Sequence, residues 1–354
     1  MRPQVRDDLA ALTGYHSPQV EVDVRLNTNE APGPPPPEFS QAVAEAIKDL
    51  EWHRYPDRAA IELRTAIGAI YERGPEEVFV ANGSNEVLQT LLLTFAGAGR
   101  QTLTFEPTYA LHSHLSRITG SETVAVDRQP DFRLDAQDAV AAIAKHRPAI
   151  TFLCSPNNPT GLVEPFETLG AVLEAVEAVD GLLVVDEAYG EFAPRSAVEL
   201  LGEDRSLVVT KTYSKTWAMA GARLGYLLGP SWLVECLEMV VLPYHLDSVK
   251  QAAGLAALDF VDAMNARVAG IVEERGRIET GLRDLGAEVW PSGSNFVLFR
   301  PPLPGGEVWQ ALVDRSVLVR NTASWEYLDG CLRVTIGTAE ENGRFLAALA
   351  DILD

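Results

Sequence analysis

The sequence predicts an α/β protein: a large domain with a mostly parallel, seven-stranded sheet between helices, followed by a smaller α+β domain. Short, continuously apolar segments alternate with helical segments from about residue 76 to 229. Strands that are apolar on both faces are typical of parallel sheets covered by helices. After about residue 245 the pattern changes to a long helical segment followed by short strands. The chain has 354 residues, which is enough for two domains.

The large domain is expected over residues 41–245 and the smaller domain over residues 246–354. The large domain is predicted to have strands over 78–81, 101–106, 122–126, 148–155, 181–188, 206–212 and 222–229. Its predicted helices cover 40–50, 84–95, 109–118, 136–146 and 166–179. The smaller domain is predicted to have helices over 249–285 and 339–353, and strands over 287–290, 295–299, 317–320 and 331–336.

Residues 1–40 are expected to form an N-terminal arm that packs with the smaller domain. Within the arm, the proline-rich run 31–37 (APGPPPP) excludes helix and central strand, because proline fixes φ and lacks a backbone donor. The run is therefore predicted to be a stiff, extended connector. Two interpretations remain open for it: a plain linker, or an arm laid across a cleft or a partner subunit.

Composition narrows the classes of partner. The formal net charge of −21 disfavours binding to nucleic acid or to an anionic membrane. No apolar run reaches the ~18 residues that a membrane span needs, and no secretory signal follows the N-terminus, so a cytoplasmic protein is expected. The three cysteines are far apart in the sequence, so they predict buried thiols in a reducing compartment and no metal site.

Polar side chains follow five of the predicted strands in the large domain. Because ligands of parallel α/β sheets bind at the carboxyl ends of the strands, these groups are expected to share one site. The groups lie in segments 82–85 (NGSN), 106–109 (EPTY), 155–161 (SPNNPTG), 186–189 (DEAY) and 212–215 (TYSK), and Arg223 opens the next strand.

The glycine turn before helix 84–95 is a candidate phosphate site. Gly83, Ser84 and Asn85 would present free backbone N–H groups at the positive end of a helix. Ser214 and Arg223 would complete the site, since a guanidinium matches phosphate geometrically. Considered alone, Ser84 is more often a plain helix cap and Arg223 a surface ion-pair residue.

Asp186 and Lys215 indicate the chemistry. Asp186 follows the apolar run LLVV, where a carboxylate is costly unless it meets a cation such as a protonated pyridine nitrogen. The alternative for Asp186 is a turn cap. Lys215 follows a strand in a loop of small residues, and a lysine shielded from water can form an imine with an aldehyde. Together with the phosphate site, these groups fit pyridoxal 5′-phosphate.

Three more side chains fit the same cofactor. Tyr109 would stack on its ring, although one tyrosine is also explained by interface packing. Asn157 and Tyr189 would donate hydrogen bonds to its phenolic oxygen. Lys215, when not bound to the aldehyde, would carry the proton between the substrate and the cofactor.

Motifs along nearly the whole chain match a known family. They are RLNTNEAP (25–32), HRYPD (53–57), ANGSNE (81–86), EPTY (106–109), SPNNPTG (155–161), VVDEAYGEF (184–192), TYSKTWAMAGARLGY (212–226), LPYHL (242–246), SNFVLF (294–299) and CLRVTIGT (331–338). On these motifs the chain resembles the fold-type I, class II aminotransferases, and within them the histidinol-phosphate aminotransferase family. The Asn-Pro-Thr-Gly, Asp-x-x-Tyr and Ser-x-Lys set is specific for the superfamily, and the arm and RYPD are more specific for the subgroup.

The resemblance implies a role for each matching residue. Lys215 would be the Schiff-base lysine, Asp186 the partner of the ring nitrogen, and Tyr189 a further catalytic residue. The other cofactor-binding residues would be Gly83, Ser84, Asn85, Tyr109, Asn157, Thr212, Ser214 and Arg223. Tyr55 in RYPD would reach the cofactor phosphate of the other subunit, which makes the active unit a homodimer. The substrate would be held by Arg333, with Tyr15, Asn29, Asn157 and Arg320 nearby.

Arg320 and Arg333 have a competing interpretation as edge-strand residues that aid solubility. Each follows an apolar strand segment of the smaller domain, however, and closure of that domain would bring both over the cofactor. The functional interpretation is therefore preferred.

The implied reaction is reversible amino transfer between L-histidinol phosphate and 2-oxoglutarate, which gives imidazole acetol phosphate and L-glutamate in histidine biosynthesis. It would follow a ping-pong route through pyridoxamine phosphate, with one arginine-lined pocket accepting both anions in turn. The alternatives are an aromatic (phenylalanine) aminotransferase, a decarboxylase acting on a phosphorylated amino acid such as threonine phosphate, and a cofactor-binding regulator, which the retained Lys215 disfavours. The unusual, bulky segment 321–327 (NTASWEY) near the expected substrate pocket leaves the amino donor open.

Overall fold

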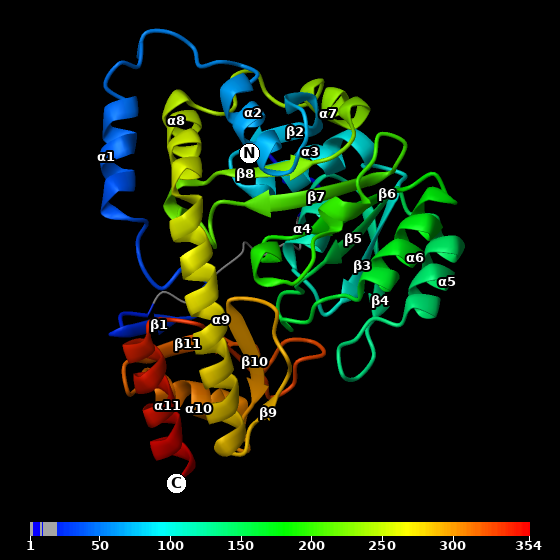
Figure 1. Ribbon diagram of the computed structural model, residues 1–354. Coiled ribbons are helices and arrows are strands. Elements are labelled where there is room, and N and C mark those ends of the chain that lie inside the picture. Colours follow the sequence, from blue (N-terminus) through cyan, green and yellow to red (C-terminus); the bar gives the residue numbers. More distant parts are fainter. Residues whose placement is uncertain (1–2, 8, 10–19) are drawn as a thin grey trace.

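A seven-stranded sheet forms the centre of the large domain in the computed structural model, which describes residues 3–7, 9 and 20–354 (Figure 1). The strand order is β2-β8-β7-β6-β5-β3-β4. β8 runs antiparallel to both β2 and β7, whereas the remaining neighbours are parallel. The strands are β2 (Val78–Ala81), β3 (Gln101–Glu106), β4 (Glu122–Asp127), β5 (Ile150–Cys154), β6 (Leu182–Asp186), β7 (Leu207–Thr212) and β8 (Gly225–Leu228). The predicted α/β class with a mostly parallel seven-stranded sheet is confirmed.

Helices cover both faces of this sheet, so its strands are apolar on both sides. Along β6, Leu182 and Val184 pack with the cluster of α3, α4 and α7, whereas Leu183 and Val185 pack with the cluster of α5 and α6. This alternation follows from the two-residue period of a strand. The large-domain helices are α2 (Ile61–Ile70), α3 (Ser84–Phe95), α4 (Leu111–Ile118), α5 (Ala136–His146), α6 (Phe166–Glu177) and α7 (Ser231–Glu238).

The small domain is built on a five-stranded sheet with the order β1-β11-β12-β10-β9. β1, from the N-terminal arm, pairs in parallel with β11, whereas the other neighbours are antiparallel. The strands are β1 (Val24–Leu26), β9 (Glu288–Val289), β10 (Phe296–Arg300), β11 (Val317–Asn321) and β12 (Leu332–Thr335). The helices α10 (Gly305–Val313) and α11 (Ala339–Leu353) pack on this sheet, as Figure 1 shows in orange and red.

The helix predicted over 249–285 is wrong as a single element. The structure has α8 (Ser248–Ala257), a 3-10 turn (Leu258–Phe260) and α9 (Val261–Asp284). The break lets α8 pack on the large domain while α9 continues toward the small domain (Figure 1). No glycine or proline lies at residues 258–260, so nothing in the sequence indicated that the helix is interrupted there. Because Met264 of α9 still belongs to a large-domain cluster, the domain boundary at residue 245 stays a prediction.

The proline run also ends differently from the prediction. Helix α1 (Pro37–Ala46) begins at Pro37, so the exclusion of helix over 31–37 is wrong at its last residue. The first helical position has no intrahelical N–H bond to lose, and proline is accepted there. The strand β1 and the helices α2, α7 and α10 were not predicted. In the part of the chain that the structure describes, no helix is long and apolar enough to span a membrane.

Candidate active site

A cavity of about 420 Å³ opens at the carboxyl ends of the parallel strands, and residues from both domains line it. This volume lies in the range of small-molecule sites. The large domain contributes Ser84, Asn85, Thr108, Tyr109, Ala110, Leu111, Cys154, Asn158, Pro159, Asp186, Ala188, Tyr189, Thr212, Ser214, Lys215, Ala220 and Arg223. The arm and the small domain contribute Asn27, Thr28, Asn29, Glu30, Arg320, Trp325 and Arg333.

Asp186, the last residue of β6, is a buried carboxylate of this cavity. It lies two residues beyond Val184 and therefore faces α4, where Nε2 of the buried His112 is 3.0 Å from its Oδ2. Its Oδ1 accepts hydrogen bonds from the Ala188 N–H (3.1 Å) and the Thr210 hydroxyl (3.3 Å). The contacts keep the carboxylate in a fixed position at the cavity wall, where it can pair with a cationic ligand atom.

Lys215 lines the same cavity, and its amine is held between the arm and the large domain. Nζ donates to the carbonyl oxygen of Thr28 (3.2 Å) and lies 5.7 Å from the centre of the Tyr189 ring. Burial and the nearby cations Arg333 and Arg223 lower the pKa of Lys215 to about 8, whereas Glu30 opposes the shift. About a tenth of the amine is thus neutral at pH 7, far more than for an ordinary lysine, and the neutral form is the one that attacks an aldehyde.

This pKa predicts how the cofactor-free protein captures pyridoxal 5′-phosphate. Only the neutral amine reacts, so the rate constant should rise about tenfold per pH unit below pH 8 and level off above it. A lysine with an ordinary pKa would keep rising to about pH 10.4. Stopped-flow absorbance between about pH 6 and about pH 10 measures the profile, and a free lysine derivative measured in parallel serves as the reference for an ordinary pKa. A rise that continues through pH 10 would contradict the lowered pKa.

The glycine turn and Arg223 form one compact anion-binding corner. Gly83 has φ +84°, and a Cβ atom there would lie 2.7 Å from Nη2 of Arg223, so the guanidinium needs the missing side chain. Arg223 Nη1 also donates to the Ser214 hydroxyl (3.4 Å). Ser84 and Asn85 begin α3 and line the cavity. Free N–H groups, a helix N-terminus and a guanidinium together suit a phosphate.

Thr212 shapes this corner from the end of β7. Its hydroxyl accepts a hydrogen bond from the Ser214 N–H (3.1 Å) and donates one to the Ser214 hydroxyl (3.0 Å). The two bonds fix the turn that leads to Lys215. The structure thereby brings together all the residues predicted around the phosphate from this subunit.

Arg320 and Arg333 are directly opposite each other on the neighbouring strands β11 and β12, and both line the cavity. Both side chains are buried, at 7 % and 6 % exposure. Arg333 donates from Nη1 to the Asn158 side-chain oxygen and from Nη2 to the Asn27 carbonyl (3.2 Å). Like charges in such cross-strand pairs are unfavourable, so two buried guanidinium groups indicate a place for an anion.

Tyr189 and Asn29 connect the arm to the large domain at the cavity. The Asn29 side-chain amide donates to the Tyr189 hydroxyl (2.8 Å), and the Asn29 N–H donates to the Thr335 hydroxyl (2.9 Å). Burial raises the pKa of Tyr189 to about 12, although Arg333 and the Asn29 hydrogen bond oppose the shift. Tyr189 is therefore a neutral phenol that can donate a hydrogen bond into the cavity.

Asn157 is placed away from the cavity, and its neighbour Asn158 lines it instead. The Asn157 amide donates to the Pro107 carbonyl and the Thr160 hydroxyl (both 2.9 Å) and accepts from the Thr108 hydroxyl (2.8 Å). These bonds use both ends of the buried side chain, so Asn157 supports the loop. The sequence alone could not show which of the two asparagines faces the cavity, because adjacent residues in a loop have no periodic pattern that gives their orientation.

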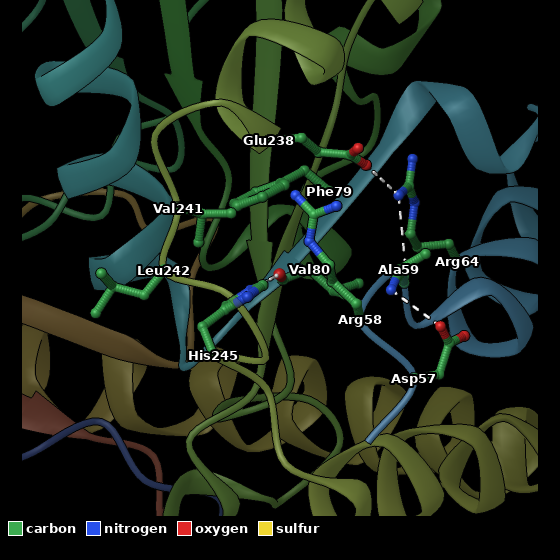
Figure 2. A pocket seen from close by; sticks show the side chains of 10 residues that line it. All are labelled: Asp57, Arg58, Ala59, Arg64, Phe79, Val80, Glu238, Val241, Leu242 and His245. Atoms are coloured by element: carbon green, nitrogen blue, oxygen red, sulfur yellow. Dashed lines mark hydrogen bonds and ion pairs between the residues drawn. The ribbon is translucent and has the colours of Figure 1, made fainter. Parts of the chain in front are cut away.

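Tyr55 does not line this cavity in the described part of the chain. Its side chain is 79 % exposed and stacks on Tyr244 at 4.5 Å between ring centres. Tyr15 lies outside the residues that the structure describes. A second, smaller pocket of about 170 Å³ is lined by residues 57–59, 64, 79, 80, 238, 241, 242 and 245, and Arg64 pairs there with Glu238 (Figure 2). None of the predicted site residues lines it.

Sequence reasoning missed several residues that the cavity or its walls use. They include His112 and Thr28, whereas Thr108, Asn158 and Trp325 lie in segments that were expected near the site but were given no role of their own. His112 lies three positions after Tyr109, and nothing in the sequence singled it out; only the packing of α4 beside β6 reveals its partner Asp186. In residues 3–7, 9 and 20–354, no group of His, Cys, Asp and Glu side chains is arranged to hold a metal ion.

Comparisons with known proteins agree with this geometry. Residues 21–349 match the family model for class I and II aminotransferases. The chain is 43% identical to a histidinol-phosphate aminotransferase of Mycobacterium avium over 98% of its length and 88% of that relative. It is 45% identical to one from Frankia casuarinae over 99% of its length and 90% of that relative.

A solved structure extends the comparison. The histidinol-phosphate aminotransferase of Sinorhizobium meliloti, determined in complex with pyridoxal 5′-phosphate, superposes with a TM-score of 0.84 at 26% identity. The match covers 94% of this chain and 91% of that one. With a family model over most of the chain and curated relatives above 40% identity, this chain belongs to the class I and II aminotransferases, and within them to the histidinol-phosphate aminotransferase family.

Proposed function

We propose that this aminotransferase moves an amino group between L-histidinol phosphate and 2-oxoglutarate, with pyridoxal 5′-phosphate as its cofactor. One observation carries the proposal. A single cavity contains an amine of lowered pKa, a buried carboxylate, a phosphate-binding corner and two buried arginines. The first three features fit the cofactor, and the arginines fit an anionic substrate.

The residues present fit the cofactor group by group. Lys215 would hold its aldehyde carbon, and Asp186 would face its ring nitrogen. Ser84, Asn85 and Arg223 would hold its phosphate. Asn158, rather than Asn157, would face the ring oxygen together with Tyr189, because Asn158 is the asparagine that lines the cavity. Tyr109 would stack on the ring from the same wall.

When bound, pyridoxal 5′-phosphate supplies an electron-withdrawing ring that makes the donor's Cα–H acidic. The remaining tasks belong to the chain. The carboxylate of Asp186 keeps the ring nitrogen protonated, since a buried negative charge stabilises a cation at this place. Nζ of Lys215 accepts the proton that leaves the donor's Cα and delivers it again, because its pKa is near the working pH. The neutral phenol of Tyr189 stabilises negative charge beside it.

Arg320 and Arg333 select the substrate. The two residues are opposite each other on neighbouring strands, are buried and line the same cavity, so a phosphate monoester or a carboxylate bound there can accept hydrogen bonds from both. L-Histidinol phosphate carries such a phosphate, and 2-oxoglutarate carries two carboxylates. One pocket can therefore serve the two substrates in turn.

The active unit is a homodimer in this proposal, and Tyr55 completes the site of the partner. Large apolar side chains are exposed together in segments 52–55 and 239–244: Trp52, Tyr55, Met239, Val240, Leu242 and Tyr244. The stacking of Tyr55 on Tyr244 places the two segments side by side. An exposed apolar patch of this kind favours burial against a second copy. The pocket of Figure 2 lies in the same region.

A mixing experiment tests the shared site. Tyr55→Ala chains and Lys215→Ala chains are each expected to be strongly impaired. A hybrid dimer combines the intact Lys215 of one chain with the intact Tyr55 of the other. Refolding the two variants together should restore about a quarter of the wild-type activity, because half of the dimers are hybrids and each has one complete site. Mixed chains that are no more active than the separate variants would refute the shared site.

We also place the enzyme in the cytoplasm. Cys154, Cys236 and Cys331 are free thiols, which suits a reducing compartment.

The half-reaction tests the proposed donor. Purified holoenzyme is mixed with L-histidinol phosphate alone, and the absorbance of the cofactor is followed without the keto acid. Conversion at low donor concentration is expected, with L-phenylalanine requiring a much higher concentration. A holoenzyme that reacts with phenylalanine but ignores histidinol phosphate would refute the substrate while leaving the aminotransferase chemistry intact.

A further inference from the structure

The segment 322–330 forms one rim of the active-site cavity and is an ordered turn. The Thr322 hydroxyl donates to the Cys331 carbonyl (2.6 Å), and the Gly330 N–H donates to the Ala323 carbonyl (3.1 Å). Both bonds close the segment at its base, just after β11 and just before β12. The rim segment is thus held in shape by one side-chain and one backbone hydrogen bond at its base.

Two contacts attach the rim segment to the large domain. The Tyr327 hydroxyl donates to Oδ1 of Asp127 at the end of β4 (2.7 Å). Leu328 is buried in a cluster with Phe132 of the large domain and Trp290 of the small domain, whose rings are 5.0 Å apart. The rim segment therefore has a defined position across the two domains.

Trp325 is the residue that the rim segment presents to the cavity. It lines the cavity together with Arg320, whose guanidinium lies 5.2 Å from the centre of the indole ring. This distance is typical of a cation–π contact. The Trp325 side chain is still 38 % exposed, so the protein covers only part of its surface. A rigid, flat apolar surface is thus available next to a cationic one.

We propose that Trp325 is a specificity-determining residue that packs against the planar ring of the amino donor. The inference rests on the proposed function. In L-histidinol phosphate the phosphate arm and the imidazole arm leave the same carbon, so an anion held at Arg320 brings the ring close to Trp325. L-Glutamate, the donor of the reverse reaction, has no ring and gains nothing from this surface. Trp325 therefore favours ring-bearing donors over L-glutamate.

The test compares donors in the half-reaction of holoenzyme variants. In Trp325→Ala, the ratio of kcat/KM for L-histidinol phosphate to that for L-glutamate should fall about tenfold, which is the usual size of an aromatic contact. The half-saturating concentration of L-histidinol phosphate should rise, whereas the maximal rate should stay the same, because the ring packs equally well before and during the reaction. Trp325→Phe should recover most of the ratio.

Tyr327→Phe is the matched control, because it removes the hydrogen bond to Asp127 and keeps the ring at 327, Trp325 and the buried Leu328 cluster that still attaches the rim segment to the large domain. Its donor ratio should stay at the wild-type value. An unchanged cofactor absorbance spectrum shows that each variant has an intact site. An equal loss for both donors would mean that Trp325 acts only through Arg320, and an unchanged ratio would mean that no ring packs there; either result overturns the inference.

L-Phenylalanine separates this inference from the proposed function. Wild-type enzyme that ignores histidinol phosphate refutes the proposed substrate. The ratio of kcat/KM for L-phenylalanine to that for L-glutamate then tests the role of Trp325, because phenylalanine also carries a planar ring. This ratio should fall in Trp325→Ala.

Discussion

Replacing Lys215 with alanine is expected to lower the rate of amino transfer by about 10⁴-fold or more. The residue is the amine of lowered pKa in the cavity, and no other lysine lines it. The variant therefore loses both the group that binds the cofactor aldehyde and the base that moves the Cα proton. Steady-state turnover and the absorbance of the purified protein measure the two losses separately.

Lys48→Ala is the control for this prediction, because Lys48 lies in the turn after α1 with a side chain that is 63% exposed. It should retain wild-type turnover. Small primary amines added to Lys215→Ala should restore part of the rate, since a free amine can accept the same proton. Near-normal turnover of Lys215→Ala without added amine would disprove the assigned role.

Asp186→Asn should lower kcat by about 10³-fold, which is the usual effect of removing a buried electrostatic group from a site. Asparagine matches the shape but carries no charge, so the ring nitrogen loses the anion that keeps it protonated. The contacts with His112 and Thr210 show that the site is built around a carboxylate at this position. Rapid measurement of the half-reaction would place the loss in the proton-transfer step.

Asp180→Asn serves as the matched control. Asp180 lies just before the N-terminal end of β6, whereas Asp186 ends that strand, and the Asp180 side chain is 95% exposed. It should leave kcat unchanged. A kcat for Asp186→Asn within about tenfold of wild type would show that the carboxylate does not control the ring nitrogen.

The sequence was sufficient for the sheet of the large domain and for most of its helices, because the central strands are apolar and those helices are periodic; α2 and α7 were not predicted. Strand β3 and helices α3 and α5 have the predicted bounds, and the class of the fold and the aminotransferase family are confirmed. Strand β1 escaped prediction because three residues carry no recognisable period, and its partner β11 lies almost 300 positions away. Pairing between strands so far apart in the sequence cannot be predicted from local patterns of residues.

The site shows the same limit. Lys215, Asp186 and Arg223 were identified because strand ends of a parallel sheet must meet, and the cavity contains all three. His112 and Thr28 were not, because their roles depend on which helix and which arm residue pack beside those strand ends. The roles assigned to individual residues stay predictions until the variants are measured.

The pairing of β1 with β11 has a consequence for how the molecule is made. Strand β1 supplies the edge of a sheet whose other strands lie between residues 288 and 335. The small domain therefore cannot be completed until residue 335 has left the ribosome. Since Thr28 and Asn29 lie shortly after β1 and contact Lys215 and Tyr189, the Lys215 amine acquires its surroundings only in this late step. Nascent chains should thus lack activity until β1 has paired with β11.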